Sequence, residues 1–259
     1  MRKRLTAGLV TAASTLVLLV TLGACVSTPR AALTTADDFS ECVVLLHGLN
    51  RSWRSMRPMA DALNKAGFTI VNVDYPSQSG SVEHLVPLSV GIGLQECRDS
   101  GARRIHFVTH SIGGILLRYA HDQSPIPDLG RVVMLAPPNH GSEVVDRTRD
   151  WPGAELFAGE AGLQLGTDVA SVPSQLGAVD FELGVIAGTG TTNPVFSAIL
   201  PKPNDGKVTV ASTRVIGMDD FLIVEKSHRY IMRNEIVIAN TRSFLQTGEF
   251  IDKHVPTEQ

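Results

Sequence analysis

The sequence has little net charge, few cysteines and no cofactor motif. Its 23 lysines and arginines nearly balance 26 aspartates and glutamates, which leaves a formal net charge of −3. Because the basic residues beyond the N-terminus are scattered, we expect no nucleic-acid-binding surface. No residues show metal-ligand spacing and no phosphate-binding glycine fingerprint occurs, so we expect neither a metal nor a cofactor. Internal repeats are also missing. With 259 residues, 43% of them hydrophobic, the chain can bury a full core and is expected to form one globular domain.

The N-terminus indicates export. Arg2, Lys3 and Arg4 precede an uncharged, apolar run that starts at Leu5, which is the pattern of a secretory signal. The run is long enough to cross a bilayer, so an uncleaved signal anchor is the alternative.

The apolar run ends in Leu-Gly-Ala-Cys at residues 22–25, which resembles the lipobox of bacterial lipoproteins. This resemblance implies cleavage of a signal peptide, residues 1–24, and lipidation of Cys25. Several acyl chains anchor a protein stably, because each buried methylene contributes about 0.8 kcal/mol. Residues 25–40 lack apolar periodicity and predict a tether. We therefore expect an exported lipoprotein, anchored through Cys25 to a membrane of a bacterial cell envelope.

Between residues 41 and 250, short apolar runs alternate with amphipathic segments. Short, continuous apolar runs are typical of strands buried on both faces. Their alternation with helices predicts an α/β fold with a mostly parallel, doubly wound sheet. The expected strands are 42–48, 68–76, 104–111, 130–138, 182–188 and 221–225, and the expected helices are 56–67, 82–101, 112–122 and 230–245.

One long segment, residues 148–180, interrupts this alternation. It is rich in Gly, Ala and Pro and is too long for an ordinary connection. Trp151, Leu156, Phe157 and Leu163 give it apolar groups to bury, so we expect a small cap over the strand ends; a loose surface insertion is the alternative. Residues 251–259 form a polar tail.

Ser111 is the candidate nucleophile. In sheets of this kind functional residues lie at the carboxyl ends of the strands. Ser111 lies where a strand ends and a helix begins. Residues 109–113, Thr-His-Ser-Ile-Gly, fit the nucleophile-elbow pattern Gly-x-Ser-x-Gly except at Thr109, which replaces the first glycine. A serine that merely caps the following helix is the alternative.

A nucleophilic serine needs a histidine base, which follows the serine and the acid along the chain in this architecture. His228 directly follows the last expected strand and is our candidate. His121 ends a helix and His254 lies in the tail, whereas His140 follows a strand and could line the pocket.

The histidine in turn needs a carboxylate that fixes its tautomer and stabilises its charged form. Asp205 lies after the strand at 182–188 and before the last strand, as the chain order requires. Asp180, Asp219 and Asp220 precede strands and belong at the opposite edge of the sheet. We therefore predict Asp205 as the acid, with a simple turn-forming role in Asn-Asp-Gly as the alternative.

Acyl transfer also needs backbone N–H groups that stabilise the oxyanion. Ile112, the residue after the nucleophile, supplies one. The loop that leaves the first strand at Gly48 can turn the Leu49 N–H toward the same point, although a simple strand end would also explain the His-Gly pair.

Five segments together resemble the bacterial lipase and esterase branch of the α/β-hydrolase superfamily. The resemblance covers about residues 41–250 and implies an α/β-hydrolase domain with a cap. It also implies Ser111 as nucleophile, Asp205 as acid, His228 as base, and Leu49 and Ile112 as oxyanion donors. The five segments are VVLLHGL (43–49), VTHSIGG (108–114), VMLAPPNHGSE (133–143), NDGKVTV (204–210) and SHRYIM (227–232).

The other two cysteines are candidates for a disulfide. Export would place Cys42 and Cys97 in an oxidising compartment, where pairing is allowed. Cys42 opens the first strand and Cys97 closes the helix before the third strand, so both are expected at the amino end of the sheet. Two buried free thiols are the alternative.

These features predict a serine hydrolase that cleaves carboxylic esters through an acyl-enzyme on Ser111. Acyl or lipid esters are the expected substrates, because the enzyme would sit at a membrane and carry apolar cap residues. A thioesterase or acyltransferase would use the same triad. A non-catalytic binding protein on the same fold is the alternative from another class, and only Thr109 favours it.

Overall fold

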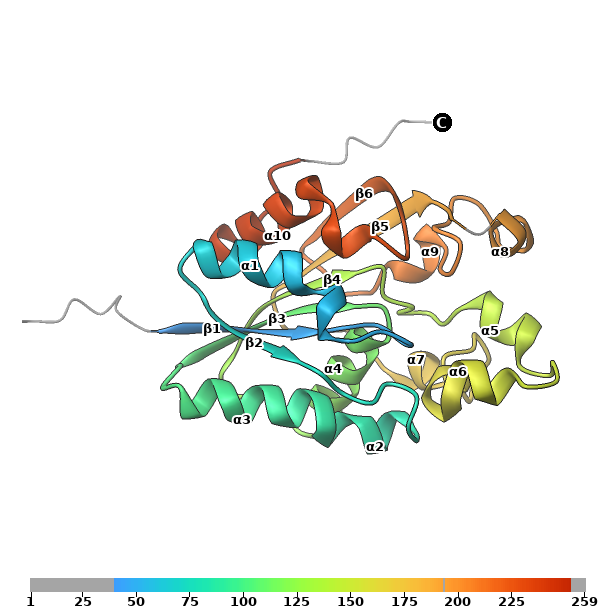
Figure 1. Ribbon diagram of the computed structural model, residues 1–259, viewed down its shortest axis with the longest axis horizontal. Coiled ribbons are helices and arrows are strands. Elements are labelled where there is room, and N and C mark those ends of the chain that lie inside the picture. Colours follow the sequence, from blue (N-terminus) through green and yellow to red (C-terminus); the bar gives the residue numbers. More distant parts are fainter. Residues whose placement is uncertain (1–39, 193, 253–259) are drawn as a thin grey trace, which may run out of the picture. The chain divides into compact units, whose positions relative to one another are not determined.

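The computed structural model describes residues 40–192 and 194–252, which form one compact unit (Figure 1). The expected signal peptide, Cys25, residues 25–39 of the tether and residues 253–259 of the tail lie outside the described residues. No helix in the described ranges is long and apolar enough to cross a membrane.

Six strands, all paired in parallel, form a sheet with the order β2-β1-β3-β4-β5-β6. This arrangement confirms the expected parallel, doubly wound sheet. The first strand lies next to the edge strand β2, and β3 to β6 extend the sheet in order from its other side. The strands are β1 (Glu41–Leu46), β2 (Thr69–Val73), β3 (Arg104–His110), β4 (Leu129–Leu135), β5 (Leu183–Gly190) and β6 (Asp220–Ser227).

Each face of the sheet has its own hydrophobic core. Successive side chains of a strand point to opposite faces, so β1 sends Val43 and Leu45 into one core and Val44 and Leu46 into the other. Figure 1 shows the two helix layers on either side of the strands. The first layer contains α1 (Arg57–Lys65) and α10 (Glu235–Thr247), and the second contains α2 (Val82–Val86), α3 (Ile92–Asp99) and α4 (Ile112–Gln123).

Two expected helices differ from the observed ones for local reasons. Pro87 has no N–H to donate, and the chain passes from α2 into α3 through a π-helical turn, η2 (Pro87–Gly91). The last helix begins at Glu235, later than expected, because the Asn234 side chain caps it by accepting from the Val237 N–H at 3.3 Å. A short 3₁₀ turn, η3 (Ile231–Arg233), precedes it.

Helices α5 (Glu143–Thr148), α6 (Ala154–Leu163) and α7 (Val172–Gln175) connect β4 to β5. Figure 1 shows them beyond the carboxyl ends of the strands. The backbone oxygen of Phe157 in α6 accepts hydrogen bonds from Asn50 Nδ2 at 2.6 Å and Gln78 Nε2 at 3.1 Å. These bonds join α6 to the loops that follow β1 and β2.

Three of the four apolar residues expected to be buried in this segment are exposed. Trp151, Leu156 and Phe157 keep 55%, 78% and 72% of their surface accessible. The sequence expectation was therefore wrong for them. Backbone groups of α6, rather than these side chains, make polar contacts with the body of the fold: two carbonyls accept from Asn50 and Gln78, and the Ala161 N–H donates to the Gly80 oxygen at 3.0 Å.

The sequence analysis did not assign the helices between β5 and β6. They are α8 (Pro194–Ile199) and α9 (Val210–Thr213). The Thr209 side chain caps α9 by accepting from the Ser212 N–H. A 3₁₀ turn, η1 (Trp53–Ser55), precedes α1.

Cys42 and Cys97 form a disulfide. Both are fully buried, and their Cα atoms lie 5.7 Å apart. Cys42 lies near the start of β1 and Cys97 in the second half of α3. The bond therefore lies toward the amino end of the sheet.

Loss of this disulfide is expected to lower the free energy of unfolding by about 2–5 kcal/mol, because it would release a loop that spans 55 residues in the unfolded chain. The measurement compares urea unfolding of the oxidised protein with that of a Cys42→Ala, Cys97→Ala double variant. Reductant should destabilise the wild type under unfolding conditions and leave the double variant unchanged. Equal stability of the two oxidised proteins would contradict the prediction.

Candidate active site

Ser111 lies on a sharp turn between β3 and α4. Its backbone has φ 55° and ψ −124°, a region that non-glycine residues rarely adopt and that stores strain at functional sites. The hydroxyl makes no capping hydrogen bond with α4. Instead, Ser111 Oγ lies 3.0 Å from Nε2 of His228. This geometry argues against the alternative of a helix-capping serine.

Thr109 occupies the position where the elbow pattern has its first glycine, and the structure accommodates it through a different glycine. Thr109 is buried in β3, opposite the first turn of α4. A Cβ added at Gly114 would lie 3.3 Å from Thr109 Oγ1 and 3.1 Å from Met134 Sδ. Gly114 therefore supplies the space between strand and helix that the glycine of the pattern would otherwise supply.

His228 and Asp205 come together with Ser111 from two different loops. His228 follows β6 directly, and its Nδ1 lies 2.8 Å from Asp205 Oδ2. The carboxylate can only accept, so Nδ1 carries the proton and Nε2 offers its lone pair to the Ser111 hydroxyl. The side chains of His228 and Asp205 are 13% and 1% exposed, so the pair is largely shielded from water.

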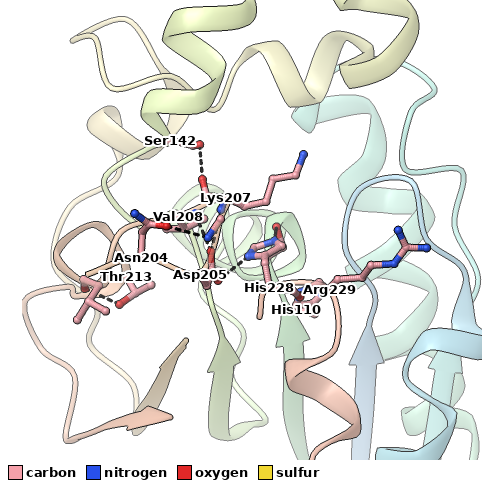
Figure 2. Close-up of polar contacts among 12 residues, drawn as sticks. His110, Ser142, Asn204, Asp205, Lys207, Val208, Thr213, His228 and Arg229 are labelled. Atoms are coloured by element: carbon pink, nitrogen blue, oxygen red, sulfur yellow. Dashed lines mark hydrogen bonds and ion pairs between the residues drawn. The ribbon is translucent and has the colours of Figure 1, made fainter. Parts of the chain in front are cut away.

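The backbone of the Asp205 loop holds the carboxylate in place, as Figure 2 shows. Oδ1 accepts hydrogen bonds from the Lys207 N–H at 3.0 Å and from the Val208 N–H at 2.8 Å. The Asp205 carbonyl also accepts from the His228 N–H at 3.2 Å. Asp205 therefore shapes a turn and also faces His228, so the two interpretations of this residue are compatible.

His110, which precedes Ser111, forms a hydrogen bond with the loop that carries His228. Its Nε2 donates to the backbone oxygen of His228 at 3.0 Å. The ring is almost fully buried, and burial, together with the nearby His228, holds its pKa well below the usual value. His110 is therefore neutral near pH 7. The sequence analysis missed this contact, because it joins residues 118 positions apart.

Two backbone N–H groups near Ser111 are available to a substrate oxygen. Within the described chain, neither the Leu49 nor the Ile112 N–H donates to another residue. The loop after β1 approaches the serine closely, since a Cβ added at Gly48 would lie 3.2 Å from Ser111 Cβ and 2.5 Å from His110 Nδ1. Only glycine fits there, and Leu49 follows it directly.

His47 orients the peptide that carries the Leu49 N–H. Its Nε2 accepts from the Tyr75 N–H at 3.3 Å, so Nδ1 carries the proton and donates to the Gly48 oxygen at 2.9 Å. That oxygen and the Leu49 N–H belong to one planar peptide unit. The hydrogen bond from His47 thus fixes the direction of the Leu49 N–H, a role that the sequence analysis did not assign to the His-Gly pair.

The residues weighed as alternatives lie elsewhere. His121 pairs with Asp180 at 3.1 Å, and Asp219 accepts from the Leu183 N–H at 2.8 Å at the start of β5. His140 follows β4 but is exposed. Asp220 accepts from the Phe250 N–H at 2.8 Å, and His254 lies outside the described residues.

Three buried histidines are expected to make the fold sensitive to acid. Burial lowers the pKa of His47, His106 and His110 in the folded state. Below about pH 6.5 the unfolded chain therefore binds more protons than the folded one. The free energy of unfolding should fall with decreasing pH by about 1.4 kcal/mol per pH unit for each histidine that stays neutral only when folded. Urea unfolding at pH 7.5 and pH 5.5 measures this, and equal stabilities would contradict it.

Comparisons with known proteins agree with this architecture. Residues 43–235 match the model of a family described as the alpha/beta hydrolase family. No curated protein sequence matches significantly.

Solved structures share the fold at low sequence identity. The mature form of the Bacillus licheniformis lipase BlEst2 aligns with a TM-score of 0.68 and 21% identity, covering 84% of this chain and 95% of that one. Phospholipase PlaB from Legionella pneumophila aligns with a TM-score of 0.57 and 17% identity over 78% of this chain and 57% of that one. The metagenomic carboxyl esterase MGS0156 aligns with a TM-score of 0.56 and 20% identity over 74% and 65%. Since the family model matches well over half of the sequence, this chain belongs to the alpha/beta hydrolase family.

Proposed function

We propose that this protein is a serine hydrolase that cleaves carboxylic esters through an acyl-enzyme on Ser111. The observation that carries the proposal is the continuous contact from Ser111 Oγ through His228 to Asp205, with distances of 3.0 Å and 2.8 Å. The names of similar structures, which include a lipase, a phospholipase and a carboxyl esterase, support an ester as the substrate. Acyl or lipid esters are the proposed class.

The first half of the reaction forms the acyl-enzyme. Ser111 Oγ attacks the ester carbonyl carbon while His228 Nε2 takes the hydroxyl proton. The Asp205 carboxylate stabilises the resulting imidazolium, and the N–H groups of Leu49 and Ile112 donate to the oxyanion. When the tetrahedral intermediate collapses, the bond to the alcohol oxygen breaks and His228 returns the proton to that oxygen.

The second half repeats these steps with water. His228 takes a proton from a water molecule as its oxygen attacks the acyl carbon. Collapse of the second tetrahedral intermediate breaks the bond to Ser111 Oγ, which recovers its proton from His228. The acid leaves and the resting serine and histidine are restored, so the reaction consumes one water and no other reagent.

The test uses the domain that starts near Ala31, with a fluorophosphonate and with nitrophenyl esters of short and long acyl chains. A fluorophosphonate labels an activated serine, and mass spectrometry of the digest should find the label on Ser111. Hydrolysis of the nitrophenyl esters should be detectable, and its profile defines the preferred acyl length. Absence of both labelling and hydrolysis would overturn the proposal.

We also propose that the protein is exported and anchored through lipid on Cys25, after cleavage of residues 1–24. The basic N-terminus and the Leu-Gly-Ala-Cys sequence at residues 22–25 support this, and a buried disulfide fits an oxidising compartment. In a bacterial host, the full chain should incorporate labelled palmitate and partition into membranes. Cys25→Ser should abolish the label and leave the precursor uncleaved, whereas a lipid label that persists in this variant would contradict the proposal.

A further inference from the structure

Four basic residues near the candidate active site have no acidic partner. Elsewhere in the described fold some basic residues, such as Arg98 and Arg149, form ion pairs with carboxylates, and others, such as Lys65 and Arg147, do not. Among the described residues, no carboxylate oxygen lies within ion-pair distance of the basic groups near the site, which belong to Arg51, Lys207, Arg229 and Arg233.

Lys207 and Arg51 belong to the loops that hold the reacting groups. Lys207 lies two residues after Asp205, and its backbone N–H binds the Asp205 carboxylate. Figure 2 shows its side chain extending away from the strands. The Nζ atom lies 5.3 Å from the centre of the Phe196 ring.

Arg51 reaches the histidine loop from the loop that follows β1. It lies two residues after Leu49, whose N–H is a candidate oxyanion donor. Arg51 Nη2 lies 3.5 Å from the backbone oxygen of Arg229, the residue after His228. Arg51 thus belongs to the oxyanion loop and Lys207 to the acid loop, and Arg51 also contacts the histidine loop.

The positive charges in this region are close enough to repel one another. Lys207 is exposed overall, but partial desolvation of its ammonium, together with the Arg51 charge, lowers its pKa. Burial also lowers the pKa of Arg51, as do the charges of Arg229 and Arg233. Asp205 opposes this effect on Lys207, but both of its oxygens already bind His228 and backbone N–H groups.

We propose that Lys207 and Arg51 bind an anionic group, phosphate or carboxylate, on the alcohol portion of the ester substrate. The inference rests on the proposed function, because His228 is the group that protonates the leaving alcohol. Lys207 lies two residues from the acid that contacts His228, and Arg51 contacts the residue after His228. An anion on the alcohol would pair with both cations and would relieve their mutual repulsion.

The first experiment compares matched esters that differ in the charge of the alcohol. The soluble pair is the acetate ester of 4-hydroxyphenyl phosphate and that of 4-hydroxybenzamide. The lipid pair is a monoacylglycerol phosphate and the same monoacylglycerol, both in neutral detergent micelles. The preference is the ratio of kcat/KM for the anionic ester to kcat/KM for the neutral one. A preference in the soluble pair would mean that the phosphate of a small, water-soluble ester is sufficient for recognition. A preference found only in the lipid pair would mean that the anion is recognised as part of a lipid headgroup.

Lys207→Met and Arg51→Met should each lower this preference about tenfold, because each removes a charged partner of the anion. Lys207→Arg should retain most of it. The control is Lys65→Met, because Lys65 ends α1 on the side of the sheet where β2 begins, and it should not change the ratio. Added salt should also lower the preference of the wild type. Equal ratios in the wild type and both Met variants would overturn the proposal.

The second experiment separates this proposal from the proposed function. On a Ser111→Ala background, calorimetry measures binding of 4-hydroxyphenyl phosphate and of 4-hydroxybenzamide. The phosphate should bind at least about tenfold more tightly, and Lys207→Met should remove the difference. If the phosphate binds in this way but the wild type hydrolyses no ester, the proposed chemistry fails and the anion site stands. If the two compounds bind equally, the anion site fails whatever the wild type hydrolyses.

Discussion

Ser111→Ala is expected to lower the turnover of nitrophenyl esters by about a millionfold. The variant removes the oxygen that would attack the carbonyl and leaves His228 and Asp205 in place. Backbone N–H groups of Leu49 and Ile112 would still bind the carbonyl oxygen, so some residual rate over water is expected. The effect should fall on kcat far more than on KM, because the serine acts in the transition state.

The measurement pairs steady-state kinetics with fluorophosphonate labelling. Ser124→Ala is the matched control, because Ser124 caps the opposite end of the same helix and should label and turn over like the wild type. Thermal unfolding of both variants checks that the fold is intact. Activity of Ser111→Ala within tenfold of the wild type would mean that another residue is the nucleophile.

Asp205→Asn is expected to lower kcat about ten-thousandfold. The carboxylate oxygen Oδ1 accepts from two backbone N–H groups, those of Lys207 and Val208. The amide oxygen of an asparagine would take that place, because only it can accept, and the NH2 group would then face Nδ1 of His228. His228 would be driven into the tautomer with its proton on Nε2, where it can no longer accept the proton of Ser111.

Kinetics across pH provide the test for Asp205→Asn, with circular dichroism as the check on folding. Asp219→Asn is the control, since Asp219 accepts from a backbone N–H near the start of β5 and lies far from the triad in the fold. Asp219→Asn should keep its activity. A loss of less than about tenfold in Asp205→Asn would show that His228 does not depend on this carboxylate.

The strands were accessible from sequence because each carries a local signal, and the structure brings the three predicted residues Ser111, Asp205 and His228 into contact. The strands are continuous apolar runs, for which burial on both faces leaves little choice of structure. Ser111 is marked by its small and apolar neighbours. His228 and Asp205 were found by chain order and by their places after strands, so they followed from the topology and not from their own neighbours.

Several of the features that were missed depend on contacts between distant segments, and the others on local details that the pattern does not record. The bond from His110 to the His228 carbonyl and the bond from Tyr75 to His47 join separate loops, and no local pattern records them. The last helix starts later than expected because the Asn234 side chain accepts a hydrogen bond from the Val237 N–H and so fixes the helix start at Glu235. Exposure of Leu156 and Phe157 was missed because apolar side chains alone do not reveal which face of a short helix meets the body of the fold.

The contact between Thr109 and Gly114 changes how relatives of this chain should be recognised. Residues 109 and 114 share the limited space at the elbow. In this chain the glycine of the pair is residue 114, on the helix, and the larger residue, Thr109, is on the strand. A text pattern that demands glycine two residues before the serine would pass over this chain and any homologue built in the same way. In a mutant library the two positions should be varied jointly, because a side chain added at either one reduces what the other can accept.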